Sequence, residues 1–207
     1  HIDGAFGALA ILSPAHKARL AGIERAHSLA FDFHKWLHVP YDAGCILVRD
    51  GAAHLAAFSS RPDYLTGAAR GLAAGEPWLC EYGPELSRGF RALKVWMTLK
   101  TYGTDALGAS IAANCDLAQY LAGRMADFDD LECVAPVAFN ICCFRFRPSG
   151  ADAATLDALN AEIVMQLHEQ GIAAPSMTRV RGRVAIRVNI TNHRTQASDL
   201  DALINGV

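Results

Sequence analysis

The sequence lacks the patterns that mark membrane proteins, disulfide-stapled proteins and phosphate-loop enzymes. Its apolar runs fall short of the roughly 20 residues that a transmembrane helix needs, so no membrane partner is expected. The six cysteines include no Cys-x-x-Cys pair and lie mostly in apolar surroundings, which favours reduced thiols in a cytoplasmic protein over disulfides or a metal site. No glycine-rich phosphate loop is present. The net charge of −2 gives no reason to expect nucleic acid as a partner.

The composition is that of a folded globular protein, because hydrophobic residues make up 52% of the chain and charged residues 19%. Apolar periodicity and turn residues predict the order of the elements. Beyond residue 103 the expected strands alternate with helices, which indicates a smaller α+β domain there. Strands are expected at 1–3, 28–33, 45–49, 131–134, 139–146 and 184–190, and helices at 13–26, 51–58, 86–102, 105–125, 153–170 and from 198 onward.

Residues 59–84 have a different composition from their surroundings. They contain several glycines and prolines and many alanines, without a helical or strand period. A segment of this length inside a compact domain is usually functional or mobile. We therefore predict that it forms a mobile lid.

An acid and a lysine follow two neighbouring expected strands. Asp3 ends the first strand, and His34 and Lys35 come directly after the second. In an open α/β sheet the carboxyl ends of adjacent strands meet in one crevice, where ligands bind. Pyridoxal 5'-phosphate (PLP) needs such a pair, because the lysine forms the Schiff base and the carboxylate keeps the pyridine nitrogen protonated. By position alone, Asp3 also fits a turn or helix cap and Lys35 a surface lysine.

At these residues the chain resembles the group II PLP-dependent decarboxylases, which include the aromatic-L-amino-acid decarboxylases. The resemblance rests on Asp3 at a strand end, on the His-Lys-Trp run at 34–36 and on Tyr64 at the family's spacing from that lysine. It extends from residue 1 to about residue 195. It implies an α/β protein of fold type I, the PLP-dependent transferase-like fold.

The resemblance also implies the domain organisation. Residues 1–104, with the lid at about 59–84, correspond to the C-terminal part of the large PLP-binding domain, and residues 105–207 to the small α+β domain. The family's ring-stacking histidine and most of its phosphate-binding residues lie N-terminal to His1. The chain is therefore expected to be a C-terminal fragment that does not catalyse a reaction alone.

Four residues match the family's cofactor site. Lys35 matches the Schiff-base lysine, and Asp3 matches the acid that pairs with the pyridine nitrogen. Ala5 matches a small residue that packs against one face of the ring. His34 matches a histidine near the cofactor phosphate that takes part in proton transfer, and its alternative role is to satisfy a neighbouring backbone group.

Tyr64, inside the predicted lid, matches the tyrosine that closes over the substrate and protonates its α-carbon after carbon dioxide leaves. A tyrosine hydroxyl in a site without water is a suitable general acid. Relatives that form aldehydes oxidatively carry phenylalanine at this position, so Tyr64 favours simple decarboxylation. Without the resemblance, Tyr64 would be read as an aromatic loop anchor.

Two further residues are candidates for substrate contacts. Ser87 lies where plant relatives carry serine with phenolic substrates and glycine with indolic ones, although a helix N-cap explains the same serine. Gly89 replaces the second arginine of the family's Arg-Arg-Phe run. Arg187 matches an arginine of the small domain near the active site, where it could bind an anionic group, and a structural salt bridge is the alternative.

The sequence therefore predicts a PLP-dependent carboxy-lyase that converts an L-amino acid, such as tyrosine, dihydroxyphenylalanine or tryptophan, to the amine and carbon dioxide. The resemblance implies a cytoplasmic homodimer that acts in amino acid metabolism. Two related enzymes remain alternatives: a decarboxylase of acidic amino acids and an aldehyde-forming oxidative decarboxylase. A non-catalytic member that keeps the fold for assembly is a further alternative.

Overall fold

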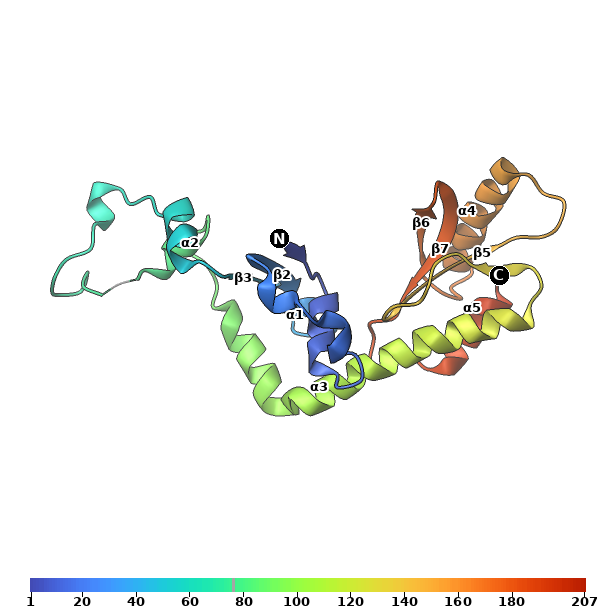
Figure 1. The fold of residues 1–207 in the computed structure, drawn as a ribbon, viewed down its shortest axis with the longest axis horizontal. Coiled ribbons are helices and arrows are strands. Elements are labelled where there is room, and N and C mark those ends of the chain that lie inside the picture. The colour runs from blue at the N-terminus through green and yellow to red at the C-terminus, as the bar shows by residue number, and fades with distance from the viewer. Residues whose placement is uncertain (76) are drawn as a thin grey trace. The chain divides into compact units, whose positions relative to one another are not determined.

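The computed structural model describes residues 1–75 and 77–207 and divides the chain into two compact units. The first unit comprises His1–Leu9 and Leu20–Gly103, and the second comprises Ala10–Arg19 and Thr104–Val207. Figure 1 shows the elements of both units along the chain. Residue 76, within the predicted lid, lies outside the described residues.

The first unit is built on a three-stranded mixed sheet in the order β1-β2-β3. Strand β1 (Ile2–Asp3) pairs in parallel with β2 (Ser28–Asp32), and β2 pairs antiparallel with β3 (Gly44–Val48). The short helix α1 (Phe33–Trp36) follows β2 directly, and α2 (Gly51–Phe58) follows β3. This arrangement confirms the expected parallel pair with Asp3 at one strand end and the His-Lys run beyond the other.

The connection between β1 and β2 is not the single helix that the sequence predicts at 13–26. It consists of three short 3-10 helices, Gly7–Leu12, Lys17–Leu20 and Ile23–Arg25. Gly22 adopts a left-handed backbone with φ of 95°, which a right-handed helix cannot contain. This residue interrupts the segment that the helical period predicts.

Helix α3 (Arg91–Arg124) contains a break at Gly103, where φ is 74° and ψ is 161°. Glycine adopts this backbone without steric cost, so the predicted division of the two helices at Gly103 is confirmed. The first part begins at Arg91 rather than at residue 86, and residues 86–90 are not helical. Ser87 is therefore not a helix N-cap.

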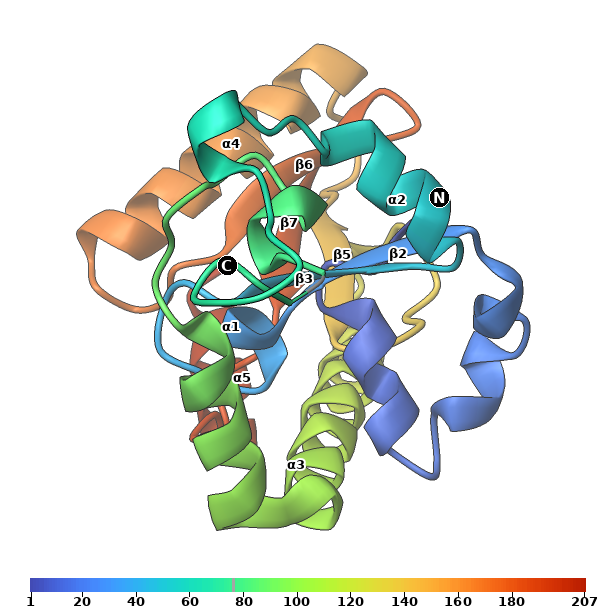
Figure 2. The same ribbon diagram turned by 90° about the vertical axis from the view of Figure 1, so that its left-hand side faces the viewer.

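The second unit contains an antiparallel sheet in the order β4-β5-β7-β6. The strands are β4 (Leu131–Cys133), β5 (Ile141–Phe146), β7 (Arg183–Asn189) and β6 (Ser176–Val180). Helix α4 (Ala153–Glu169) packs along β7 (Figure 2), and α5 (Ala197–Asn205) ends the chain. The sequence did not predict β6, because this edge strand is largely polar and pairs only with β7.

Successive side chains along β5 and β7 point to opposite faces of the sheet, so the sheet of the second unit has an apolar face and a polar face. Cys142 and Phe144 of β5 pair with Val188 and Ile186 of β7, and all four belong to one core with residues of α3, α4 and α5. On the opposite face the ladder pairs Cys143 with Arg187. The helices therefore cover the apolar face. The buried core of this unit includes Ala118, Leu121, Cys142, Phe144, Val164, Leu167, Ile186 and Leu203.

The six cysteines are free thiols. Within residues 1–75 and 77–207, no helix is long and apolar enough to cross a bilayer. The same described residues contain no cluster of three or more histidine, cysteine, aspartate or glutamate side chains arranged to hold a metal ion.

Two backbone segments of the second unit approach each other closely at Gly108 of α3, so this position requires a residue without a Cβ atom. A Cβ atom at Gly108 would lie 2.2 Å from the carbonyl oxygen of Leu12. Gly108→Ala is therefore expected to lower the free energy of unfolding by about 2 kcal/mol, because a backbone atom yields less than a flexible side chain. Urea unfolding followed by circular dichroism measures this change.

Gly123, in the same helix, provides the matched control, because nothing lies within 4 Å of a Cβ atom there. Gly123→Ala is expected to stabilise the helix by up to about 1 kcal/mol. Equal effects of the two substitutions would contradict the close packing of Gly108 on Leu12.

Candidate functional site

The carboxyl end of β1 is held tightly to the end of β2. The Asp3 carboxylate accepts a hydrogen bond from the Ala5 amide at 3.0 Å, and the Ala5 carbonyl accepts one from the Asp32 amide at 2.6 Å. A Cβ atom at Gly4 would lie 2.7 Å from the Ala8 side chain, so only glycine allows this packing. The turn after β1 thus fixes Asp3 and Ala5 beside the end of β2.

Lys35 projects from α1 at the same edge of the sheet. Its Nζ lies 2.5 Å from Asp32 Oδ2, and its side chain is 40% exposed. The neighbouring Trp36 and Leu37 are each 1% exposed and anchor the segment in the core. The apolar setting expected for Lys35 therefore belongs to its neighbours, and the amine itself is ion-paired with Asp32. Sequence reasoning did not identify Asp32.

His34 has a defined hydrogen-bonding role. Its Nδ1 accepts a hydrogen bond from the Ala43 amide at 2.9 Å, and its ring lies against Tyr41 with centroids 4.2 Å apart. The neutral ring therefore carries its proton on Nε2, which can act as a donor. The alternative role considered for His34, contact with a backbone group, is observed at one nitrogen and leaves the other available.

Tyr64 lies in the 3-10 helix Asp63–Leu65 and its side chain is 80% exposed. Among the hydrogen bonds of the described residues, none joins Tyr64 to Asp3, His34 or Lys35. Tyr64 is thus presented to solvent from the predicted lid segment.

The two ends of the predicted lid segment are joined by an ion pair. Arg61 donates two hydrogen bonds to the Glu81 carboxylate at 2.6 and 2.5 Å, and Ser59 donates a third at 3.0 Å. The Arg61 guanidinium also lies over the Trp78 ring, 4.8 Å from its centroid. The Arg61 hydrogen bonds are the main cause that holds the pKa of Glu81 below its ordinary value. Arg61 and Glu81 therefore fix the base of the segment that carries Tyr64.

Ser87 lines a cavity of about 950 Å³ in the first unit. Arg91 donates to Asp42 at 2.9 Å and to Glu85 at 2.9 Å, and its hydrogen bond is the main cause that lowers the pKa of Asp42. No periodicity or motif in the sequence indicated this pairing. The cavity is lined by Asp42, Gly44, Leu79, Cys80, Pro84, Glu85, Leu86, Ser87, Arg88, Gly89, Phe90, Arg91 and Ala92.

The cavity borders the edge that carries Asp32. Gly44, one of the lining residues, pairs with Asp32 in the β2–β3 ladder. A Cβ atom at Gly44 would lie 3.2 Å from Asp32 Oδ1, so glycine leaves room for the carboxylate. The ion pair of Asp32 and Lys35 is thus next to the wall of the cavity.

Arg187 belongs to the second unit, on the polar face of its sheet. Its Nη1 lies 3.4 Å from Ser176 Oγ, and its side chain is half-buried. Within the part of the chain that the structure describes, no carboxylate forms an ion pair with Arg187. The salt bridge considered as an alternative role is thus not seen among the described residues, and the role of Arg187 stays a prediction.

Comparisons of the sequence and the structure with known proteins agree on one protein family. Residues 1–147 match the family described as "Pyridoxal-dependent decarboxylase conserved domain". An aromatic-L-amino-acid decarboxylase of Bacillus atrophaeus is 38% identical over 201 residues, which cover 97% of this chain and 42% of the relative. The chain therefore spans about two fifths of the length of this relative.

Solved structures show the same fold. The Oryza sativa TDC with PLP and tryptamine matches with a TM-score of 0.89 and 28% identity, covering 99% of this chain and 42% of that structure. The Rhodiola rosea 4-hydroxyphenylacetaldehyde synthase matches with a TM-score of 0.83 and 25% identity, covering 100% and 41%. The expected α/β architecture of fold type I is confirmed by these matches.

Proposed function

Because the chain belongs to the pyridoxal-dependent decarboxylase family, we propose that the whole protein is a PLP-dependent carboxy-lyase acting on an aromatic L-amino acid. The products are the corresponding amine and carbon dioxide. We propose further that it works as a cytoplasmic homodimer in amino acid metabolism, with one PLP in each subunit.

The observation that carries the proposal is the placement of Asp3 and Lys35 at one edge of the first sheet. Parallel pairing of β1 with β2 brings the two strand ends together, and the Ala5–Asp32 hydrogen bond at 2.6 Å fixes them. A carboxylate, a primary amine and a small residue between them fit the three demands of PLP: a partner for the pyridine nitrogen, a partner for the aldehyde and room for the ring.

PLP supplies, when bound, an aldehyde that bonds to amines and a ring that accepts the electrons left by departing carbon dioxide. Asp3 would hold a proton at the pyridine nitrogen, and its hydrogen bond from Ala5 keeps the carboxylate oriented. Lys35 would hold the cofactor through Nζ. The Nε2–H of His34 would donate a hydrogen bond to an anionic group, because its Nδ1 is already engaged with Ala43.

Tyr64 would supply the proton for the last chemical step. Its hydroxyl protonates the substrate α-carbon once carbon dioxide has left, and excludes reaction with oxygen at that carbon. The exposed position of Tyr64 on a loop whose base is fixed by Arg61 and Glu81 supports this role, because the loop must approach and leave the bound substrate in each cycle.

The proposed aromatic substrate is supported by the cavity beside Asp32. Leu79, Leu86 and Phe90 give it apolar walls, and Ser87 adds a hydroxyl that can hydrogen-bond a phenolic group. Arg91 is neutralised by Asp42 and Glu85, and Arg88 donates to the Leu79 carbonyl at 3.2 Å. The apolar walls and the Ser87 hydroxyl favour a phenolic substrate. Arg187 is retained as a candidate contact for an anionic group.

The proposal is tested with the full-length protein, PLP and a pool of L-amino acids, with products read by mass spectrometry. We expect tyramine, dopamine or tryptamine. Loss of glutamate or aspartate instead would identify the acidic alternative, and an aldehyde with ammonia and peroxide would identify the oxidative one. No change in any amino acid, with PLP bound, would contradict the decarboxylase and favour a protein that keeps the fold for assembly.

A further inference from the structure

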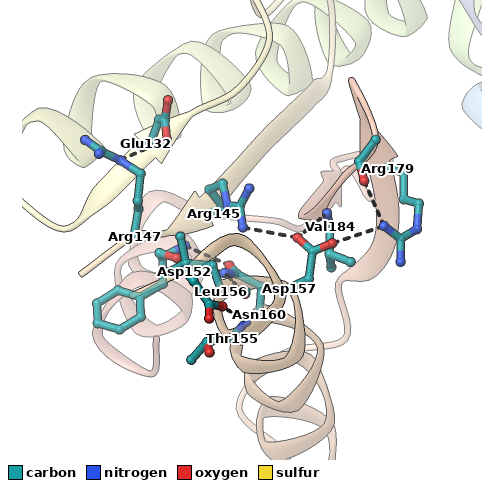
Figure 3. A network of polar contacts seen from close by, with 12 residues as sticks. Glu132, Arg145, Arg147, Asp152, Thr155, Leu156, Asp157, Asn160, Arg179 and Val184 are labelled. Atoms are coloured by element: carbon teal, nitrogen blue, oxygen red, sulfur yellow. Dashed lines mark hydrogen bonds and ion pairs between the residues drawn. The ribbon is translucent and has the colours of Figure 1, made fainter. Parts of the chain in front are cut away.

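A network of arginines surrounds one carboxylate at one end of the second unit (Figure 3). Arg145 of β5 donates to Asp157 of α4 at 3.2 Å, and Arg179 of β6 donates to the same carboxylate at 3.1 Å. The Val184 amide donates at 2.9 Å and is the main cause that lowers the pKa of Asp157. Asp157 thus ties three strands, β5, β6 and β7, to α4.

The network arises where β5 and β7 stop pairing. The last ladder pair between them is Phe144 with Ile186, so the next backbone groups need other partners. The Asp157 carboxylate accepts a hydrogen bond from the Val184 amide. The Asn160 side chain accepts one from the Phe146 amide and donates one to the Phe146 carbonyl, each at 2.8 Å. The Arg145 side chain, which reaches Asp157, is only 1% exposed.

The charges in this region do not balance. Five arginines, at 145, 147, 179, 181 and 183, accompany three carboxylates, Glu132, Asp152 and Asp157, which leaves a net charge of +2. Glu132 forms an ion pair with Arg147 at 3.0 Å, so its charge is already offset. The exposed side chains of Arg181 and Arg183 have no ion-pair partner within residues 1–75 and 77–207. This excess contrasts with the net charge of −2 for the chain.

A cavity of about 320 Å³ lies among these charges. Arg145 lines it, and the buried Nε of Arg145 has no hydrogen-bond partner among the described residues. A buried donor without an acceptor is unfavourable, the more so in a charged group, so this Nε would gain from an anionic acceptor. At about 30 Å³ per water molecule, the cavity has room for an oxyanion with an organic substituent. Its walls are Glu132, Cys133, Val134, Arg145, Val180, Arg181 and Arg183.

We propose that this cavity binds a phosphate group, free or carried by a small metabolite. Guanidinium groups recognise phosphate through paired charge-assisted hydrogen bonds. A phosphate monoester carries about −1.5 to −2 charges at pH 7, which matches the excess better than a single carboxylate does. Arg181 and Arg183 flank the turn between β6 and β7 and supply the charge, and Arg145 supplies the buried donor.

The test uses the full-length protein saturated with PLP, so that the phosphate site of the cofactor itself is filled. Calorimetric titrations with inorganic phosphate and with glycerol 3-phosphate are made at constant ionic strength set by chloride. We expect saturable binding of at least one ligand. Tighter binding of glycerol 3-phosphate indicates a metabolite, and equal binding indicates the free ion.

Arg181→Gln/Arg183→Gln is expected to weaken this binding about tenfold or more, since charge-assisted hydrogen bonds to the phosphate are lost. The control Lys17→Gln/Arg194→Gln removes the same charge from exposed positions of the second unit and is expected to leave binding within about twofold. Circular dichroism and the visible absorption of bound PLP verify folding. Absence of binding to the unmodified protein, or equal loss in both double variants, would overturn the proposal.

Discussion

Lys35→Ala is expected to remove the visible absorption of the lysine-bound cofactor and to lower decarboxylation by on the order of 10⁴-fold. Nucleophilic groups that bond covalently to the reacting centre cannot be replaced by neighbouring side chains, so their loss has effects of this size. Asp32 would then lose its partner at 2.5 Å. Absorption spectra of the full-length variant with added PLP, together with single-turnover product formation, measure both effects.

Lys100→Ala is the matched control, because Lys100 is an exposed lysine of α3 in the first unit. It should retain the absorption band and the rate. A Lys35→Ala protein with an unchanged visible band would show that another amine bonds to the cofactor, and would contradict the assignment of Lys35. Equal losses in both variants would indicate unfolding instead.

Tyr64→Phe is expected to change the product rather than abolish turnover. Without the hydroxyl that protonates the α-carbon, amine formation should fall by about 10³-fold, within the range for loss of a general acid. Carbon dioxide would still leave, and molecular oxygen would then take two electrons from the unprotonated carbon to form hydrogen peroxide, while water hydrolyses the resulting imine to the aldehyde and ammonia. The ratio of amine to aldehyde, measured by mass spectrometry with a peroxide assay, reports the switch.

Tyr102→Phe serves as the control for Tyr64, since Tyr102 is also an exposed tyrosine of the first unit. Its amine-to-aldehyde ratio should match that of the unmodified protein. If Tyr64→Phe produced amine at the original rate, the proton donor would have to be another group, with His34 the first candidate because its Nε2–H is available.

The elements that the sequence predicts correctly depend on contacts between residues close along the chain. Asp3 and Lys35 are assigned to neighbouring strand ends from two short apolar runs, because a parallel strand pair with a short connection brings its carboxyl ends to the same edge. The break at Gly103 follows in the same way, since a single residue's backbone freedom ends one helix before the next begins. Periods of 2 and 3.6 residues are likewise local properties.

The features that the sequence missed depend on partners distant along the chain. The helix expected at 13–26 fails partly because residues 10–19 pack in the second unit, with the Leu12 carbonyl against Gly108. Strand β6 forms only because β7 offers it an edge, and its polar residues carry no strand period of their own.

The same distinction holds for the candidate sites. The identities of Lys35, Asp3 and Tyr64 could be proposed from short motifs, whereas the pairing of Lys35 with Asp32 and the fixed base of the loop carrying Tyr64 required the folded chain. The cavity lined by Arg145, Arg181 and Arg183 combines residues from β4, β5 and the β6–β7 turn, which lie up to about 50 positions apart in the sequence. The sequence thus determined which chemical groups are available and near which strand ends. Only the tertiary structure decided which charges meet, because ion pairs and cavities are properties of distances in space and not of spacing along the chain.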